Sequence, residues 1–176
     1  MELVALDSMV VLWGVLSQGK ESDAPLIERA GRFIRSLDER NATVLIPSIV
    51  VGELMAGLAP NLHEAFLKTV GSRFVVAPYD LPAAAEYARL WRERHADGVL
   101  KGILEEPKSS RSRAMADAMV LAPAIARKAT AVYSHDEPMA RMAGDRIRVL
   151  KMPLVVEQTV LPFPPTAVPK KGTGQK

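Results

Sequence analysis

The sequence predicts an α/β fold with three layers, α/β/α, around a mostly parallel central sheet. Short apolar segments alternate with amphipathic stretches along the chain, as in folds whose strands are joined by crossover helices. No polar face interrupts the strands expected at LVAL (3–6) and TVLI (43–46), which indicates a sheet covered on both sides. We expect one domain over residues 1–160, because a chain of 176 residues can bury a single core and shows no internal repeat.

The apolar pattern predicts each element in turn. After the strand at 3–6, apolar residues from Leu26 to Leu37 recur at spacings of three and four, which predicts a helix over 24–40. Pro47 ends the second strand, and a polar segment at 97–111 separates the last two long helices. Further strands are expected at 43–46, 73–77, 130–134 and 146–150, and further helices at 49–57, 60–70, 82–95, 112–128 and 137–143. Pro123 should kink the helix that contains it, because it removes one backbone hydrogen bond.

The basic character of the chain is concentrated at its C-terminal end. The formal net charge is +3, with 23 basic and 20 acidic residues, and Lys170, Lys171 and Lys176 account for the whole excess. Residues 161–176 are rich in Pro and Gly and contain no acid, which predicts a flexible basic tail. A nucleic-acid partner therefore needs support from a local basic patch in the domain.

Composition also bears on location. The chain has no cysteine, which excludes disulfides and thiolate metal sites and suits a reducing cytoplasm. The apolar runs are shorter than the roughly 20 residues that span a bilayer, and the N-terminus lacks a basic signal-peptide region. We expect a cytoplasmic protein without a membrane partner.

Acidic residues follow the predicted strands. Asp7 ends the first strand, Glu53 lies on the helix after the second, and Asp136 follows the fourth. Because ligands of open parallel sheets bind beyond the carboxyl ends of the strands, these three acids should share one functional edge. Asp117 lies in RAMADAMVLA, among residues expected in the core.

Each acid also has a structural interpretation. Asp7 and Asp136 could cap helices, Glu53 could be solvated, and Asp117 could pair with Arg113 one turn earlier. If the four converge, however, mutual repulsion of about 4 kcal/mol for a pair ~4 Å apart at an effective dielectric of ~20 requires protons or a cation. Oxygen-only ligands favour Mg²⁺ or Mn²⁺, ions that support phosphodiester cleavage by water.

Four short motifs, in this order and with these gaps, resemble those of the PIN-domain nucleases: Asp7-Ser8, Val51-Gly52-Glu53-Leu54, Ala116-Asp117-Ala118 and Ser134-His135-Asp136. The nearest resemblance is to the VapC-type toxins of toxin–antitoxin pairs, and it covers about residues 1–150. It implies a PIN-like fold and a metal-dependent endoribonuclease in which the four acids are catalytic and bind Mg²⁺ or Mn²⁺. Ser134 would supply the hydroxyl two residues before the last acid, and Ser8 the small polar position beside the first.

The basic run KSSRSR (108–113) precedes Asp117 and includes Lys108, Arg111 and Arg113. It is either a solvated loop or a phosphate-binding patch beside the acids. We therefore expect Arg111 and Arg113, with Ser8 and Ser134, to bind an RNA substrate.

The resemblance also implies a small antitoxin protein as partner. Leu12, Trp13 and Leu16 could form a homodimer or antitoxin surface, or belong to the core. Two other functions stay open: an inactive PIN-like module that binds RNA or protein, and a phosphotransferase with Asp7 as nucleophile. The second usually needs another acid two residues later, where this chain has Met9.

Overall fold

The computed structural model describes residues 2–107 and 109–154. Within these residues five strands form one sheet in the order β3-β2-β1-β4-β5, and every neighbouring pair is parallel. The strands are β1 (Leu3–Leu6), β2 (Thr43–Pro47), β3 (Val75–Ala77), β4 (Ala131–Tyr133) and β5 (Arg148–Leu150). The predicted parallel α/β fold is confirmed.

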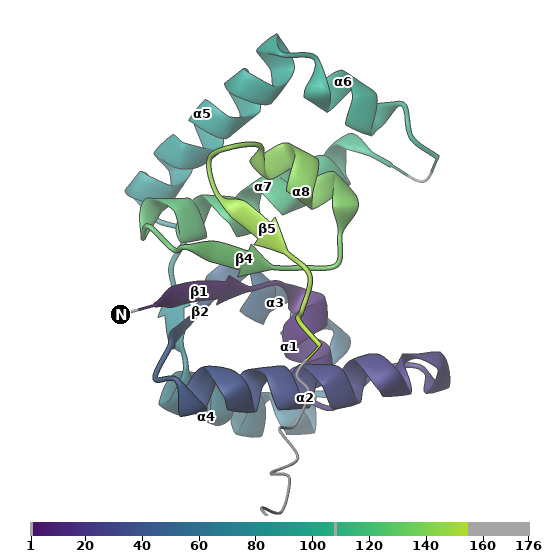
Figure 1. Ribbon diagram of the computed structural model, residues 1–176, viewed down its shortest axis with the longest axis vertical. Helices are drawn as coiled ribbons and strands as arrows, with labels where there is room; N and C mark the ends of the chain where they lie inside the picture. Colours follow the sequence, from purple (N-terminus) through teal and green to yellow (C-terminus); the bar gives the residue numbers. More distant parts are fainter. Residues whose placement is uncertain (1, 108, 155–176) are drawn as a thin grey trace, which may run out of the picture.

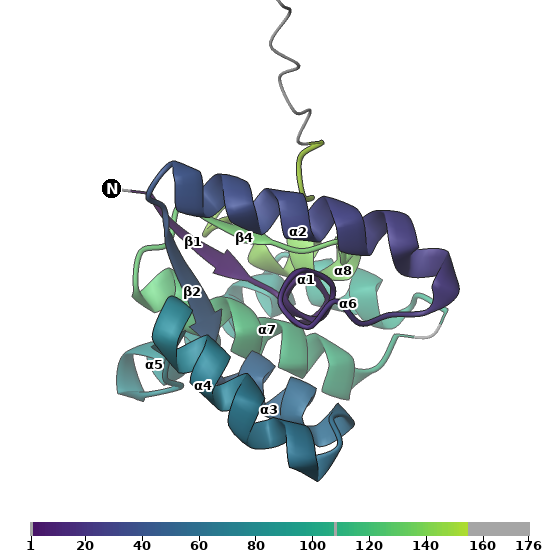
Figure 2. The same ribbon diagram turned by 90° about the horizontal axis from the view of Figure 1, so that it is seen from below.

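Eight α-helices surround the sheet within the described residues, with 3₁₀ turns at Glu21–Asp23 and Pro60–Leu62. The helices are α1 (Ser8–Gly14), α2 (Ala24–Glu39), α3 (Ser48–Gly57), α4 (His63–Arg73), α5 (Leu81–Ala96), α6 (Val99–Leu104), α7 (Arg111–Ala126) and α8 (Glu137–Ala143). In the view of Figure 1, α2 and α4 lie below the sheet and α5 to α8 lie above it, which gives the three layers. Figure 2 shows α2 and α7 on opposite sides of β1.

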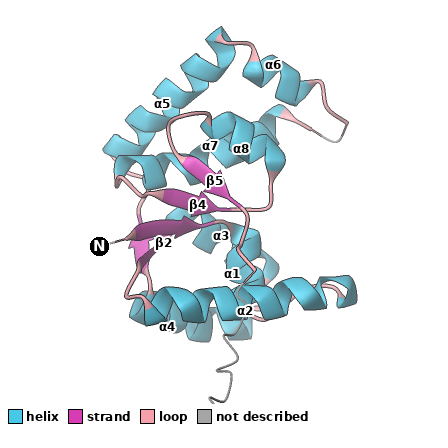
Figure 3. Cartoon of the chain, viewed as in Figure 1, coloured by secondary structure: helices cyan, strands magenta, loops and turns pink. Residues whose placement is uncertain are grey.

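Two short helices lie where the sequence pattern predicted none. Helix α1 directly follows β1 and buries Val10, Val11 and Trp13, so Trp13 belongs to the core. Helix α6 lies inside the polar segment 97–111, where it buries Leu100 and Ile103 and packs near α5, α7 and α8 (Figure 3). Both are too short for apolar periodicity to identify them.

Helix α7 brings its acid into the interior. It is packed through small side chains, since Ala114, Ala118, Ala122 and Ala124 are all buried. The helix continues through Pro123 to Ala126, and Asp117 lies well before the proline. The position of Asp117 is therefore set by the regular part of the helix.

The sequence tail lies outside the described residues, so the expectation of a flexible basic segment at 161–176 stays a prediction, as does the domain boundary at 160. Across residues 2–107 and 109–154, no helix is long and apolar enough to cross a membrane.

Close contact between α1 and α2 depends on Gly14. A Cβ atom at this position would lie 2.5 Å from Ile34 Cδ1 and 3.1 Å from the carbonyl oxygen of Ala30. We predict that Gly14→Ala lowers the free energy of unfolding by about 1–3 kcal/mol, as overpacking usually does. Urea denaturation of the variant checks this.

Gly31 on α2 is the matched control, because the nearest atom to an added Cβ there is Arg35 Nη1 at 3.8 Å. Gly31→Ala should leave stability unchanged or raise it by up to about 1 kcal/mol, because alanine favours helix over glycine. Equal urea midpoints for the two variants would contradict the proposed contact.

Candidate active site

The parallel register places Asp7 beside Ser134. Leu6 pairs with Tyr133 across β1 and β4, and the backbone N–H of Asp7 donates to the carbonyl of Tyr133 at 3.1 Å. The residues that follow the two strands are therefore neighbours at the carboxyl edge of the sheet. Ser134 is buried there with Asp7.

Asp7 is held by donors on both of its oxygens. The backbone N–H and the hydroxyl of Ser8 donate to Oδ1 at 2.7 and 3.2 Å, and the hydroxyl of Ser134 donates to Oδ2 at 2.7 Å. Asp7 also stands at the N-cap of α1. The carboxylate is only 6% exposed, and this burial raises its pKa although the bond from Ser134 opposes the shift.

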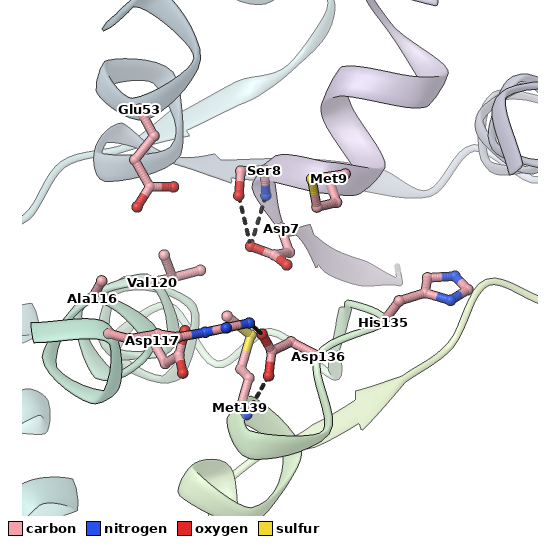
Figure 4. A pocket seen from close by; sticks show the side chains of 11 residues that line it. Asp7, Ser8, Met9, Glu53, Ala116, Asp117, Val120, His135, Asp136 and Met139 are labelled. Carbon is pink, nitrogen blue, oxygen red and sulfur yellow. Dashed lines mark hydrogen bonds and ion pairs between the residues drawn. The ribbon is translucent and has the colours of Figure 1, made fainter. Parts of the chain in front are cut away.

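All four predicted acids line one cavity of about 350 Å³ at this edge. Asp7 comes from the end of β1, Glu53 from α3, Asp117 from α7 and Asp136 from the residue before α8. Figure 4 shows the four side chains pointing into a common space. The structure therefore brings together the acids that the sequence placed at one edge, including Asp117, whose position could not be inferred from a strand end.

The pKa values of the acids reflect burial and mutual repulsion. Asp117 is 8% exposed, and burial, reinforced by the charges of Asp136 and Asp7, raises its pKa to about 7. Burial and the nearby charge of Asp7 also raise the pKa of Glu53. The positive charge in the cavity is thus too small to balance its carboxylates.

Arg113 pairs with Asp136 rather than with Asp117, which corrects one of the structural alternatives. Its Nη2 donates to Asp136 Oδ2 at 2.6 Å, and this bond raises the pKa of the Arg113 guanidinium. Asp136 also caps α8, because its Oδ1 accepts from the N–H of Met139 at 3.2 Å. The predicted cap role of Asp136 therefore exists alongside its place in the cavity.

The remaining predicted substrate residues differ in position. Ser8 and Arg113 line the cavity, and Ser134 lies behind Asp7. Arg111 is outside the cavity lining, with its guanidinium carbon 5.7 Å from the centroid of the Trp91 ring. Lys108 lies outside the described residues.

The cavity also contains residues that the sequence did not single out. His135, Met9 and Met139 form part of its wall, and the His135 ring lies edge-on to Trp13 with centroids 5.6 Å apart. The only sequence feature that pointed to His135 was its position next to Asp136. A single histidine beside an acid does not predict that its side chain lines a cavity.

The donor set fits a hard divalent cation, although the carboxylates are not gathered around a single point. Within the described parts of the chain, no three His, Asp or Glu side chains are grouped so that they could hold a metal ion in this arrangement. The four carboxylates nevertheless offer only oxygen ligands in one cavity, the chemistry that Mg²⁺ and Mn²⁺ prefer. The raised pKa values of Asp7, Glu53 and Asp117 show that added positive charge would stabilise the ionised forms of these three groups.

Comparisons with known proteins identify the family of the chain. The sequence matches the PIN domain family over residues 4–145. The chain belongs to the PIN domain family. No curated protein matches it in sequence.

Two solved structures share this PIN fold. One is a chain of VapBC from Salmonella typhimurium, solved bound to DNA, with 20% identity, a TM-score of 0.60, and coverage of 86% of this chain and 99% of that chain. The other is a chain of VapBC2 from Rickettsia felis, solved bound to a DNA fragment from the VapBC2 promoter. It has 17% identity and a TM-score of 0.59, and the match covers 85% of this chain and 98% of that chain. At these identities the likeness concerns the fold alone.

The raised pKa of Asp117 predicts how stability depends on pH in the metal-free PIN domain. Between about pH 4 and pH 7 the folded state keeps a proton that an unfolded aspartate has released, so this group's contribution to stability falls as the pH rises. Asp117→Asn removes that loss. In chelator, the variant should gain stability over the wild type with rising pH, reaching roughly 1–2 kcal/mol at pH 7.5, since solvent in the open cavity screens part of the effect.

Thermal unfolding at pH 4.5, 6 and 7.5 measures this difference directly. Asp145→Asn is the control, because Asp145 is an exposed aspartate in the turn after α8. A constant difference in Tm between Asp117→Asn and wild type across the three pH values would contradict the burial effect.

Proposed function

We propose that this PIN domain is a metal-dependent endoribonuclease that hydrolyses phosphodiester bonds of RNA with Mg²⁺ or Mn²⁺. The observation that carries the proposal is the convergence of Asp7, Glu53, Asp117 and Asp136, from four separate segments, on one cavity. Such a carboxylate cluster costs free energy without a cation, so its presence favours a metal site. Membership of the PIN domain family supports nuclease chemistry.

The four acids would hold the cation directly or through water. Ser8 and Ser134 orient Asp7, because they donate to both of its oxygens and so fix the direction of its free lone pairs. When bound, Mg²⁺ or Mn²⁺ would supply activation of a water nucleophile and stabilisation of charge on the phosphodiester. In this proposal no protein side chain acts as the nucleophile.

Basic side chains would position the RNA. Arg113 lines the cavity. Arg111 lies two residues before Arg113, at the start of α7. Contacts from these guanidinium groups to phosphates would hold the strand without reading its sequence. Binding through such contacts should weaken as salt concentration rises.

We further propose that the protein is the toxin of a toxin–antitoxin pair and acts in the cytoplasm. The fold is shared with chains of VapBC assemblies, and the motifs resemble those of VapC-type toxins. An adjacent gene that encodes a small DNA-binding protein would support this part of the proposal. The proposals of RNA cleavage and of an antitoxin partner can be tested separately, because RNA cleavage depends on the cavity alone.

Asp7→Asn tests the nuclease proposal. The substitution keeps the size of the side chain and removes its charge, so the fold should persist while Mg²⁺- or Mn²⁺-dependent cleavage of a fluorogenic single-stranded RNA falls by at least about a hundredfold. Circular dichroism and thermal unfolding check the fold. Asp145→Asn should cleave at the wild-type rate.

Contamination by other nucleases is controlled by carrying all variants through the same purification and by assays in chelator. Cleavage by Asp7→Asn at the wild-type rate, in a preparation free of contaminating nuclease, would overturn the proposal. Retained binding of RNA without cleavage by the wild type would instead favour the inactive binding module.

A further inference from the structure

The ion pair between Arg113 and Asp136 occupies the carboxylate that the proposed metal site needs. Oδ2 of Asp136 accepts from Arg113 at 2.6 Å, and Oδ1 accepts from the backbone N–H of Met139 at 3.2 Å. Each oxygen of Asp136 thus already accepts a hydrogen bond. Arg113 is the one Arg or Lys among the described residues that line the cavity, opposite four acids.

We propose that Arg113 is an internal counter-ion that competes with the divalent cation for Asp136 and is displaced when the cation binds. This inference rests on the proposed metal-dependent function. It assigns Arg113 a positioning and regulatory role: its guanidinium compensates part of the charge of the acids before the cation arrives. After displacement the same guanidinium is available to a substrate phosphate.

Displacement of Arg113 requires little free energy from the fold. Its side chain is 54% exposed while that of Asp136 is 18% exposed, and solvent around the guanidinium screens the attraction within such a pair. Arg113 lies in the first turn of α7, so a rotamer change moves its guanidinium into solvent without moving the helix. The contact is therefore weak enough to exchange.

The backbone around Asp136 is fixed independently of Arg113. The N–H of Asp136 donates to the hydroxyl of Ser134 at 3.0 Å, and that hydroxyl donates to Asp7. The cap to Met139 also holds the start of α8. Release of Arg113 thus frees Oδ2 of Asp136 while the loop that carries it stays in place.

Manganese binding to the metal-free protein tests the competition without measuring activity. Free Mn²⁺ is measured by electron paramagnetic resonance during titration of wild type, Arg113→Gln and Arg111→Gln. Arg113→Gln should bind Mn²⁺ about two- to fivefold more tightly than wild type, because a screened ion pair of this kind opposes cation binding only weakly. Arg111→Gln is the matched control, because it removes the same charge from the same turn while its guanidinium contacts Trp91.

A double-mutant cycle separates competition for Asp136 from the general effect of charge. In the Asp136→Asn background, Arg113→Gln should change Mn²⁺ affinity no more than Arg111→Gln does, because the contested oxygen is no longer charged. Asn still caps helices well, so α8 should form, and circular dichroism checks every variant.

The outcomes distinguish this inference from the proposed function. If wild type binds Mn²⁺ and Arg113→Gln binds it equally tightly, the competition is overturned and the metal site stands. An equal gain from Arg113→Gln with and without Asp136 also overturns it. If no variant binds Mn²⁺, both the metal site and the competition are overturned.

Discussion

Burial of carboxylates at the carboxyl edge of a parallel sheet is the constraint on which this structure depends. All strand pairs are parallel, so the segments after β1, β2 and β4 emerge on one side and carry Asp7, Glu53 and Asp136 to it. Helix α7 adds Asp117 from the interior. Like charges that face one cavity repel one another, as the raised pKa values of Asp117 and Glu53 show, and the site must offset that repulsion.

The protein offsets the repulsion in three ways within its own side chains. Asp7 accepts hydrogen bonds from Ser8 and Ser134. Asp117 has a pKa of about 7, so that near neutral pH a large fraction of this group is protonated. Asp136 pairs with Arg113. The hydrogen bonds, the proton and the ion pair each reduce the negative charge on one carboxylate. A divalent cation would reduce the charge on the whole cluster, which is the physical basis for the proposed metal site.

The parallel sheet and its shared functional edge could be predicted from the sequence, because apolar strands without a polar face are typical of parallel sheets. Helix α1 could not, since Val10, Val11 and Trp13 give a short apolar run that fits a strand or a helix equally well. The ion-pair partner of Arg113 could not be predicted from the sequence either. Sequence spacing favours Asp117 one turn away on the same helix, whereas Asp136 becomes a neighbour only through the packing of α7 near α8.

We propose that these four acids gather to hold a divalent cation. X-ray diffraction from a crystal grown with Mn²⁺ tests it most directly, because manganese scatters anomalously and its position needs no assumption about activity. If the acids hold the cation, an anomalous peak will lie within the cavity lined by Asp7, Glu53, Asp117 and Asp136. A map with no peak in that cavity, or with manganese bound only at other places on the surface, would contradict it.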